Sequence, residues 1–331
     1  MRPLDPPPST FLDGRALRSG SFCGALPPVD YSPVAGALTR LARHKRWVFA
    51  AIATDDVWVA FAIVRLGYVA NLFAYAVDLR TGALLSDRAA LAPPLACAVG
   101  DRAGEGCAAR FSMPRAAASF TRAVGASSYA LRVRLGALRL DARLETAGAP
   151  PPLAVLGPVP GGIGSATEKR ALLGASGELR VGSRRFRLDG GLGGFDYTNG
   201  LLARRTAWRW AYALGRAKSG ERVAVNLTSG FVGDPECAVW VDGALHGTSP
   251  ATFAFDAARP MTAPWSVATT GGEVDLRFTP MAGHRDATNL GFLKASFVQP
   301  AGRFDGTLRV EGRTLALDGV AGVTEDQDSL W

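Results

Sequence analysis

Length and composition restrict the chain to a globular protein of about two domains. Its 331 residues are 48% hydrophobic and 20% charged and include 39 glycines and 21 prolines, which excludes a fibrous or disordered chain and suits a turn-rich fold. The formal net charge of +8 comes almost entirely from arginine. These arginines alternate with apolar residues, as in residues 131–145, which is typical of solvated strand faces. The clustered charge of a nucleic-acid-binding protein is missing, so we expect no nucleic-acid partner.

The N-terminus, the cysteines and the histidines indicate a cytoplasmic protein without a metal site. Residues 1–20 are proline-rich and contain no apolar segment of the kind that a secretory signal needs. The most apolar stretch, residues 47–77, is interrupted by polar side chains before it reaches the ~20 residues of a membrane helix, so no transmembrane segment is expected. Four cysteines without a C-x-x-C pair and three distant histidines predict free thiols and no metal. The preference for arginine over lysine suggests a GC-rich bacterial genome.

The first part of the chain predicts an arm, a short helix and then strands. Prolines exclude long regular elements from residues 1–30, so we expect a poorly structured, extended N-terminal arm. Leu38 and Leu41 suggest a short helix within residues 34–46. Runs rich in valine, isoleucine and aromatic residues predict a meander of buried strands at 47–54, 57–64 and 68–78. A loop is expected at 89–106, and alternating strands follow near 108–112 and 129–145.

An internal repeat divides the chain into two similar halves. LRVGSRRFRLDG (179–190) matches LRVEGRTLALDG (308–319) at seven of twelve positions, and each segment predicts a hairpin with a glycine-containing turn. Continuing the alignment pairs Asp196 with Glu325, so a carboxylate follows each hairpin. Chance similarity between common hairpin sequences is the alternative. The 129-residue offset suits a duplicated domain and argues against a boundary in the proline-rich segment 149–164.

The resulting organisation is an all-β protein with two tandem calycin-like or lipocalin-like β-barrels. We assign residues 1–30 to the arm, 31–203 to the first barrel domain and 204–331 to the second. Many short strands separated by turns indicate a sandwich or barrel in the second half. These strands are expected at 207–214, 223–227, 238–241, 252–255, 265–269, 273–278, 293–298, 303–310 and 314–317.

The densest cluster of candidate functional residues lies between Gly190 and Trp210. The usual nucleotide-binding, zinc-protease and hydrolase signatures do not occur in the chain. Within the cluster, Asp196 follows a glycine-rich segment and is either a buried acid or base or a cap for turn amides. Trp208 and Trp210 are two residues apart and face one side of a strand, which is either core or a stacking wall for an apolar ligand.

Further polar residues extend the set of candidates. Glu325 either points inward or belongs to a solvated C-terminal tail. Three cations either bind an anionic group or cover strand faces: Lys169, Arg204 and Arg205. Three amides inside apolar strand runs need hydrogen-bond partners, which a cavity lining would satisfy: Asn71, Asn226 and Gln299.

Several segments together resemble a bacterial and fungal family classed only as a domain of unknown function. The segments are TEKR (167–170), GGLGGFDYTNG (190–200), RTAWRW (205–210) and Gln299 followed by GRFDG (302–306). The resemblance runs from about residue 45 to residue 331 and is most specific at 190–210. That family is distantly similar to the lipocalin-like proteins that include carotenoid hydratases and tocopherol cyclases.

The resemblance implies two consecutive calycin barrels with a site near their junction or in the mouth of one barrel. In the hydratase and cyclase relatives, a buried acid protonates apolar polyene or prenyl substrates, and their glycine-rich segment with an aspartate resembles that around Asp196. This chain has Tyr197 beside that aspartate, where many relatives carry a histidine.

The expected function is therefore binding of an apolar small molecule, with or without chemistry. For an enzyme we expect cofactor-free acid–base chemistry such as hydration, cyclisation or isomerisation, with Asp196 as proton donor and Glu325 as a second carboxylate. The alternative is a non-catalytic lipid or hydrophobic-ligand carrier or sensor, in which Asp196 and Arg205 tie the two halves together. Candidate ligand-binding residues are Trp208, Trp210, Asn199, Arg205, Lys169, Asn226 and Gln299.

Overall fold

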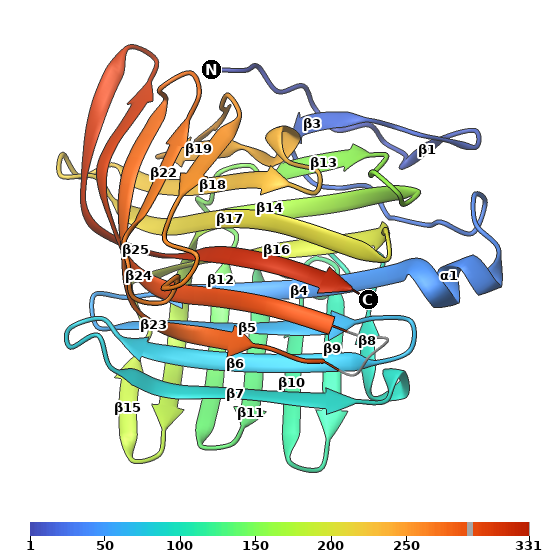
Figure 1. Cartoon of the computed structure of the whole chain (residues 1–331), viewed down its shortest axis with the longest axis horizontal. Helices are drawn as coiled ribbons and strands as arrows, with labels where there is room; N and C mark the ends of the chain where they lie inside the picture. Colours follow the sequence, from blue (N-terminus) through green and yellow to red (C-terminus); the bar gives the residue numbers. More distant parts are fainter. Residues whose placement is uncertain (290–293, 331) are drawn as a thin grey trace.

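Most of the chain forms antiparallel strands in two large sheets, one built between residues 20 and 201 and the other between residues 205 and 330 (Figure 1). The computed structural model describes residues 1–289 and 294–330. Leu293, with which one of the expected strands begins, and residue 331 lie outside these ranges.

The first sheet has a main path of eleven strands with three more attached to it. Its path is β7 (Leu84–Ala92), β6 (Ala70–Asp78), β5 (Val57–Arg65), β4 (His44–Ala53), β16 (Gly191–Leu201), β14 (Gly164–Val181), β12 (Leu138–Glu145), β11 (Ser128–Leu135), β10 (Ala116–Thr121), β9 (Ala108–Met113) and β8 (Cys97–Val99). The attached strands are β15 (Arg184–Arg187) and β13 (Leu153–Gly157), both on β14, and β3 (Gly20–Cys23) on β13.

The second sheet repeats the central order of the first with nine strands. Its path is β20 (Ala244–Gly247), β19 (Ala238–Val241), β18 (Arg222–Gly230), β17 (Arg205–Arg216), β25 (Arg313–Leu330), β24 (Lys294–Val310), β23 (Val274–Asp286), β22 (Trp265–Thr269) and β21 (Ala251–Ala254). In both sheets a four-strand meander is closed by the last strand of the unit, because β16 pairs with β4 and β25 pairs with β17.

The two hairpins found in the sequence occupy equivalent places in the two sheets. Leu179 pairs with Phe186 in the first hairpin, and Leu308 pairs with Leu315 in the second, at the same offset of 129 residues. The first hairpin turns at Gly182 and the second at Glu311 and Gly312, all with positive φ. The internal repeat of the sequence is therefore a repeat of structure.

Both sheets curl, and side-chain alternation then produces three cores. β8 and β9 contact β5 in the first sheet, and β21 contacts β18 in the second. Val48, Ala50 and Ile52 of β4 pack inside the first sheet, whereas Phe49 and the other odd-numbered residues pack against the second sheet. On β17, Trp210, Tyr212 and Leu214 face the first sheet and the alternate residues Ala211 and Ala213 face the second interior. The predicted all-β fold with two tandem barrel-like halves is confirmed.

The junction between the halves explains the continuous apolar runs in the sequence. A strand with one solvated face alternates apolar and polar residues, but β4, β5 and β6 are buried on both faces. The expected meander at 47–78 corresponds to these three strands. The short helix α1 (Ala37–Arg43) also lies within the range predicted for it.

Two segments are more regular than the sequence suggests. The arm carries the short hairpin β1 (Leu12–Asp13) and β2 (Ala16–Leu17) and then β3, so it is better structured than expected, although its prolines still exclude long elements. The loop expected at 89–106 contains the end of β7, the 3-10 turn η1 (Pro94–Ala96) and β8. Its two prolines fall between strands, where no ladder hydrogen bond is needed.

The arm also spans the junction. The backbone N–H of Arg2 donates to the carbonyl of Gly247 in the second sheet, and Ser21 of β3 donates its hydroxyl to the carbonyl of Pro235. Pro235 belongs to the 3-10 turn η2 (Asp234–Glu236). Within the described part of the chain, none of the helices has the length and apolar character needed to cross a membrane.

We predict that Gly194 is required for the close approach of the halves. A Cβ at this position would overlap the Tyr212 hydroxyl and the Arg170 carbonyl oxygen, which form a 2.7 Å hydrogen bond across the junction. Gly194→Ala should lower the free energy of unfolding by about 1–3 kcal/mol in chemical denaturation. Gly174→Ala is the control, because its Cβ meets nothing within 4 Å. Equal stability of the two variants would contradict this tight contact.

Candidate functional site

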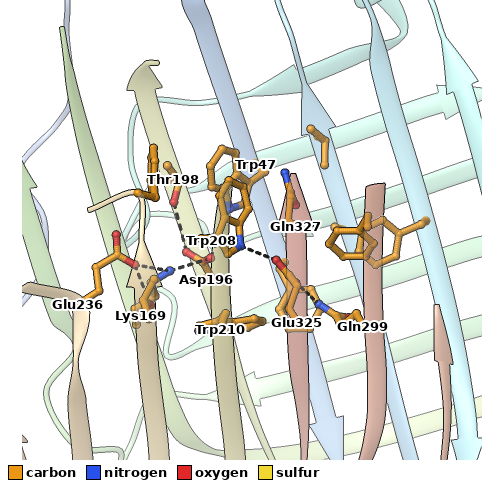
Figure 2. Close-up of a pocket in the computed structure, with 17 residues that line it drawn as sticks. Trp47, Lys169, Asp196, Thr198, Trp208, Trp210, Glu236, Gln299, Glu325 and Gln327 are labelled. Carbon is orange, nitrogen blue, oxygen red and sulfur yellow. Dashed lines mark hydrogen bonds and ion pairs between the residues drawn. The ribbon is translucent and has the colours of Figure 1, made fainter. Parts of the chain in front are cut away.

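A cavity of about 80 Å³ lies between the two sheets, not inside either barrel-like half (Figure 2). Strands β4, β5, β6, β14 and β16 supply its lining from the first sheet, and β17, β18, β24, β25 and η2 supply it from the second. Most of the lining is aromatic or aliphatic. The polar residues in it are Lys169, Asp196, Thr198, Thr228, Glu236, Gln299, Glu325 and Gln327.

One side of the cavity contains a buried ionic cluster. Lys169 of β14 lies directly opposite Asp196 of β16 in the ladder, and its Nζ is 2.8 Å from Asp196 Oδ2. The same ammonium is 3.3 Å from Oε2 of Glu236, which comes from the second half. Burial disfavours the charge on Lys169, but the two carboxylates outweigh burial and raise its pKa. Burial also raises the pKa of Glu236, against the opposing effect of Lys169.

Asp196 is surrounded by donors in addition to the ammonium. The indole N–H of Trp47 donates to Asp196 Oδ2 over 3.3 Å. The hydroxyls of Thr167 and Thr198 lie 3.1 and 3.3 Å from Asp196 Oδ1. Four groups, one of them a cation, therefore contact the two carboxyl oxygens of Asp196.

Glu325 faces the same cavity in different surroundings. Its Oε1 accepts a 2.6 Å hydrogen bond from the indole of Trp208, and its Oε2 accepts one of 2.6 Å from the amide of Gln299. No cation among the described residues forms an ion pair with it. Burial raises the pKa of Glu325 to about 7, the two neutral donors oppose this rise, and the charge of Asp196 adds to it.

A chain of hydrogen bonds fixes the orientation of the Gln299 amide. Trp58 Nε1 can only donate, and it donates to the Tyr75 hydroxyl over 3.3 Å. The Tyr75 hydroxyl in turn donates to Gln299 Oε1 over 2.8 Å. The amide oxygen is thereby engaged, so the NH₂ group points toward Glu325. This arrangement supplies a neutral donor where the first half supplies Lys169.

Tryptophans from both halves form the aromatic wall of the cavity. Trp47 of β4 and Trp208 of β17 are stacked, with ring centroids 5.9 Å apart and planes inclined by 18°. One donates to Asp196 and the other to Glu325 (Figure 2). Trp210 lies deeper, and the Lys169 ammonium is 5.7 Å from the centre of its ring. The sequence did not decide whether this side of β17 is core or a binding surface. It is core at Trp210 and cavity wall at Trp208.

The structure brings most of the expected site residues together and leaves three away from the cavity. Those that line it are Asp196, Glu325, Trp208, Trp210, Lys169 and Gln299. Asn226 lies behind the wall, where its side chain accepts from Trp210 Nε1 and donates to the Glu236 carbonyl. Asn199 instead bonds His44 and Tyr197. Arg205 is exposed and pairs with Asp328.

Asn199 and Arg205 were expected at the site because they neighbour Asp196 and Trp208 in the sequence. Neighbouring residues of a strand face opposite sides, and Asn199 is an odd number of positions from Asp196, so its side chain points into the first half. Arg205 is an odd number of positions from Trp208 and faces solvent. Strand alternation therefore accounts for both differences.

Trp47 and Glu236 are two of several lining residues that the sequence reasoning missed. Trp47 lies in the first half of β4, and its even spacing from Phe49 places both on the same face. That face is the junction, which only the paired sheets define. Glu236 lies in a turn between strands and carries no sequence signal. No group of three or more histidine, cysteine or acidic side chains suited to a metal ion occurs within residues 1–289 and 294–330.

We predict that Glu325 makes stability depend on pH. Its pKa is about 7 in the fold against 4.5 as the ordinary value, so its contribution to stability is complete below about pH 4.5 and is lost as the pH rises through 7. Glu325→Gln should remove a component on the order of 3 kcal/mol between pH 4.5 and pH 8 in denaturant unfolding. Glu145→Gln, at the partly exposed end of β12, should retain it. If the Glu325→Gln variant keeps the wild-type dependence of stability on pH, ionisation of Glu325 does not destabilise the fold.

Three solved structures resemble this fold over nearly its whole length. A Nitrosomonas europaea protein provisionally assigned as AttH is 14% identical, with a TM-score of 0.53 over 91% of this chain and 98% of that one. Kievitone hydratase from Nectria haematococca is 11% identical, with a TM-score of 0.55 over 93% of this chain and 97% of that one. CghA in complex with Sch210972 is 13% identical, with a TM-score of 0.57 over 99% and 98%.

At these identities the likeness shows the fold alone. No curated protein matches the sequence significantly. Residues 8–331 match the family described as "Domain of unknown function (DUF2804)", which covers almost the entire chain. The family resemblance expected from the sequence is therefore confirmed. The chain belongs to the DUF2804 family.

Proposed function

We propose that the protein binds an apolar small molecule in the cavity between its halves and transfers protons to and from it without a cofactor. The observation that carries this proposal is the unequal environment of two carboxyl groups on one cavity. Asp196 lies 2.8 Å from an ammonium, whereas Glu325 has only neutral N–H donors. Two titratable groups separated in this way are typical of acid–base catalysis.

Glu325 is the proton donor in this proposal. A pKa of about 7 lets the carboxyl group hold a proton near neutral pH and release it to a substrate. Asp196, which the sequence suggested as the donor, is instead assigned the base, because its Oδ2 lies 2.8 Å from the Lys169 ammonium. Both residues keep a catalytic role, and their roles are exchanged.

The proposed reaction begins with protonation of an alkene carbon or a carbonyl oxygen by Glu325. The O–H bond of Glu325 breaks, a C–H or O–H bond forms on the substrate, and positive charge develops there. The faces of Trp47 and Trp208 stabilise that charge by cation–π interaction. Asp196 then accepts a proton. If the proton comes from a water molecule that adds to the substrate, the reaction is a hydration. If it comes from an adjacent carbon, the reaction is a cyclisation or an isomerisation. Exchange with solvent returns both groups to their starting states.

The shape of the cavity limits what enters it. Its volume of about 80 Å³ is smaller than the roughly 300–1,000 Å³ of common ligand sites, so the reacting end of a ligand fits inside and the remainder extends outward. Trp47, Trp208 and Phe297 are partly exposed at its edge and offer apolar surface for that remainder. Two proteins of this fold support the class of function, one named as a hydratase and one bound to the small molecule Sch210972.

We predict that Glu325→Gln abolishes proton transfer but not binding. Prenyl and polyene alkenes incubated with wild-type protein in D₂O should gain carbon-bound deuterium, which mass spectrometry detects as an increase in mass whichever product forms. The variant should incorporate it at least about 100-fold more slowly, because general acid catalysis contributes 10²–10⁴-fold. Quenching of tryptophan fluorescence should report binding of the same compounds to both proteins.

Asp326→Asn is the matched control for this experiment. It removes a carboxyl from the next residue of β25, whose side chain pairs with Arg209 outside the cavity. The control should exchange deuterium at the wild-type rate. If Glu325→Gln also exchanges at that rate, Glu325 is not the acid.

A non-catalytic carrier is the second candidate, and the saturation of Asp196 favours it. Lys169, Trp47 and two threonines already engage both carboxylate oxygens, as expected of a group that ties β4, β14 and β16 together. In this alternative the same cavity holds the ligand and nothing is transferred.

We predict that Asp196→Asn separates the two candidates. It removes one of the two counter-charges of a buried ammonium, so the Tm should fall in either case. A carrier should retain ligand affinity within about threefold, which is less than ~1 kcal/mol, and wild-type protein should incorporate no deuterium. An enzyme should lose deuterium exchange at temperatures where circular dichroism shows the variant still folded. Exchange at the wild-type rate in the folded variant would exclude Asp196 as the base.

A further inference from the structure

We propose that a second cavity beside the first binds a hydroxyl group of the same ligand. The ligand class that follows is an elongated apolar molecule whose hydroxyl lies at the end opposite the carbon that is protonated. This inference rests on the proposed function, because it places both cavities along one molecule.

The second cavity adjoins the first and shares one wall with it. Its volume is about 100 Å³, and Val64, Phe73, Phe297 and Gln327 line both spaces. Phe73 and Phe297 contact each other with ring centroids 5.6 Å apart. Phe297 is partly exposed, so a rotation of this ring would join the two spaces without disturbing a ladder. Each cavity alone is too small for most ligands, but together they form an elongated site.

A histidine held in one orientation lines the far cavity. His284 of β23 is buried, and its Nδ1 lies 2.7 Å from Asp87 Oδ1 of β7. Its ring stacks on Phe73 with centroids 4.4 Å apart and planes inclined by 14°. A carboxylate at Nδ1 fixes the proton on that nitrogen and the orientation of the ring, and Nε2 remains available to a ligand. No described residue hydrogen-bonds Nε2.

An amide oxygen without a partner lies on the same cavity. Asn71 of β6 lines it, and its Oδ1 is buried and accepts no hydrogen bond from any described residue. An unpaired buried acceptor costs free energy unless something supplies a donor. Asn71 and His284 therefore bring two polar side chains with unused hydrogen-bonding capacity to one cavity.

These polar side chains select the chemistry of the ligand. A hydroxyl can both donate and accept a hydrogen bond, whereas an ether or ketone can only accept and a hydrocarbon can do neither. No lysine or arginine lines this cavity, and Asp286 does, so an anionic group is disfavoured. A site whose polar groups stay unpaired unless a hydroxyl binds discriminates strongly against ligands that lack the hydroxyl.

The test compares probes that differ only by a hydroxyl. trans-Stilbene is paired with 4-hydroxystilbene, and farnesene with farnesol, and binding to the full chain is followed by tryptophan quenching. In at least one pair the hydroxylated probe should bind at least about tenfold more tightly, which is about 1.4 kcal/mol. His284→Phe and, independently, Asn71→Leu should each reduce this preference by weakening the hydroxylated probe more than the hydrocarbon. His246→Phe, which alters a histidine of the second sheet outside both cavities, should retain the preference.

The outcomes distinguish this inference from the proposed function. Equal binding within both pairs, or an equal loss of both probes in His284→Phe and in Asn71→Leu, overturns the hydroxyl subsite even if Glu325→Gln stops deuterium exchange. A hydroxyl preference that disappears in the two variants supports the subsite even if no exchange is found. Failure of all four probes to bind at their solubility limits would overturn the elongated site itself.

Discussion

The buried ammonium of Lys169 is the interaction on which the rest of the site depends. It lies between Asp196 of the first half and Glu236 of the second, so one cation neutralises groups from both sheets. A buried charge without a partner strongly destabilises a fold. Removing the ammonium or the carboxylates paired with it would therefore leave a buried charge unpaired. The ionic cluster therefore fixes how η2 sits against β14. Lys169, the cation of the cavity lining, is already paired with these two carboxylates, and the hydrogen bonds to Glu325 therefore come from neutral donors.

The repeat shows how a duplicated scaffold can produce two unlike carboxyl groups. Asp196 and Glu325 occupy equivalent positions in β16 and β25, after equivalent hairpins. The strand beside each differs in what it offers, an ammonium from Lys169 in one copy and an amide from Gln299 in the other. A cation favours the carboxylate strongly, whereas an amide favours it only as a hydrogen-bond donor. One exchange of side-chain type is enough to separate the two environments.

The sequence predicted the strands and the repeat because both are local properties of the chain. Buried runs such as 47–54 and the matching hairpins can be recognised without knowing their neighbours. The junction cannot be recognised in this way, since Trp47 and Glu236 reach the cavity only through the packing of one sheet on the other. The same limit explains Arg205 and Asn199, which are close to the site in sequence but lie on the opposite faces of their strands. Asp196 and Glu325 were found because the repeat aligned them, and their environments required the adjacent strands.

The charge balance of the cavity gives a reason why acid–base chemistry suits this junction. Three carboxyl groups, Asp196, Glu236 and Glu325, line a space that one ammonium serves. Full ionisation would place two uncompensated negative charges in an apolar interior, and burial accordingly raises the pKa of both Glu236 and Glu325. The group without a cation is Glu325, and it lies against the open, tryptophan-lined side of the cavity, where a substrate would arrive.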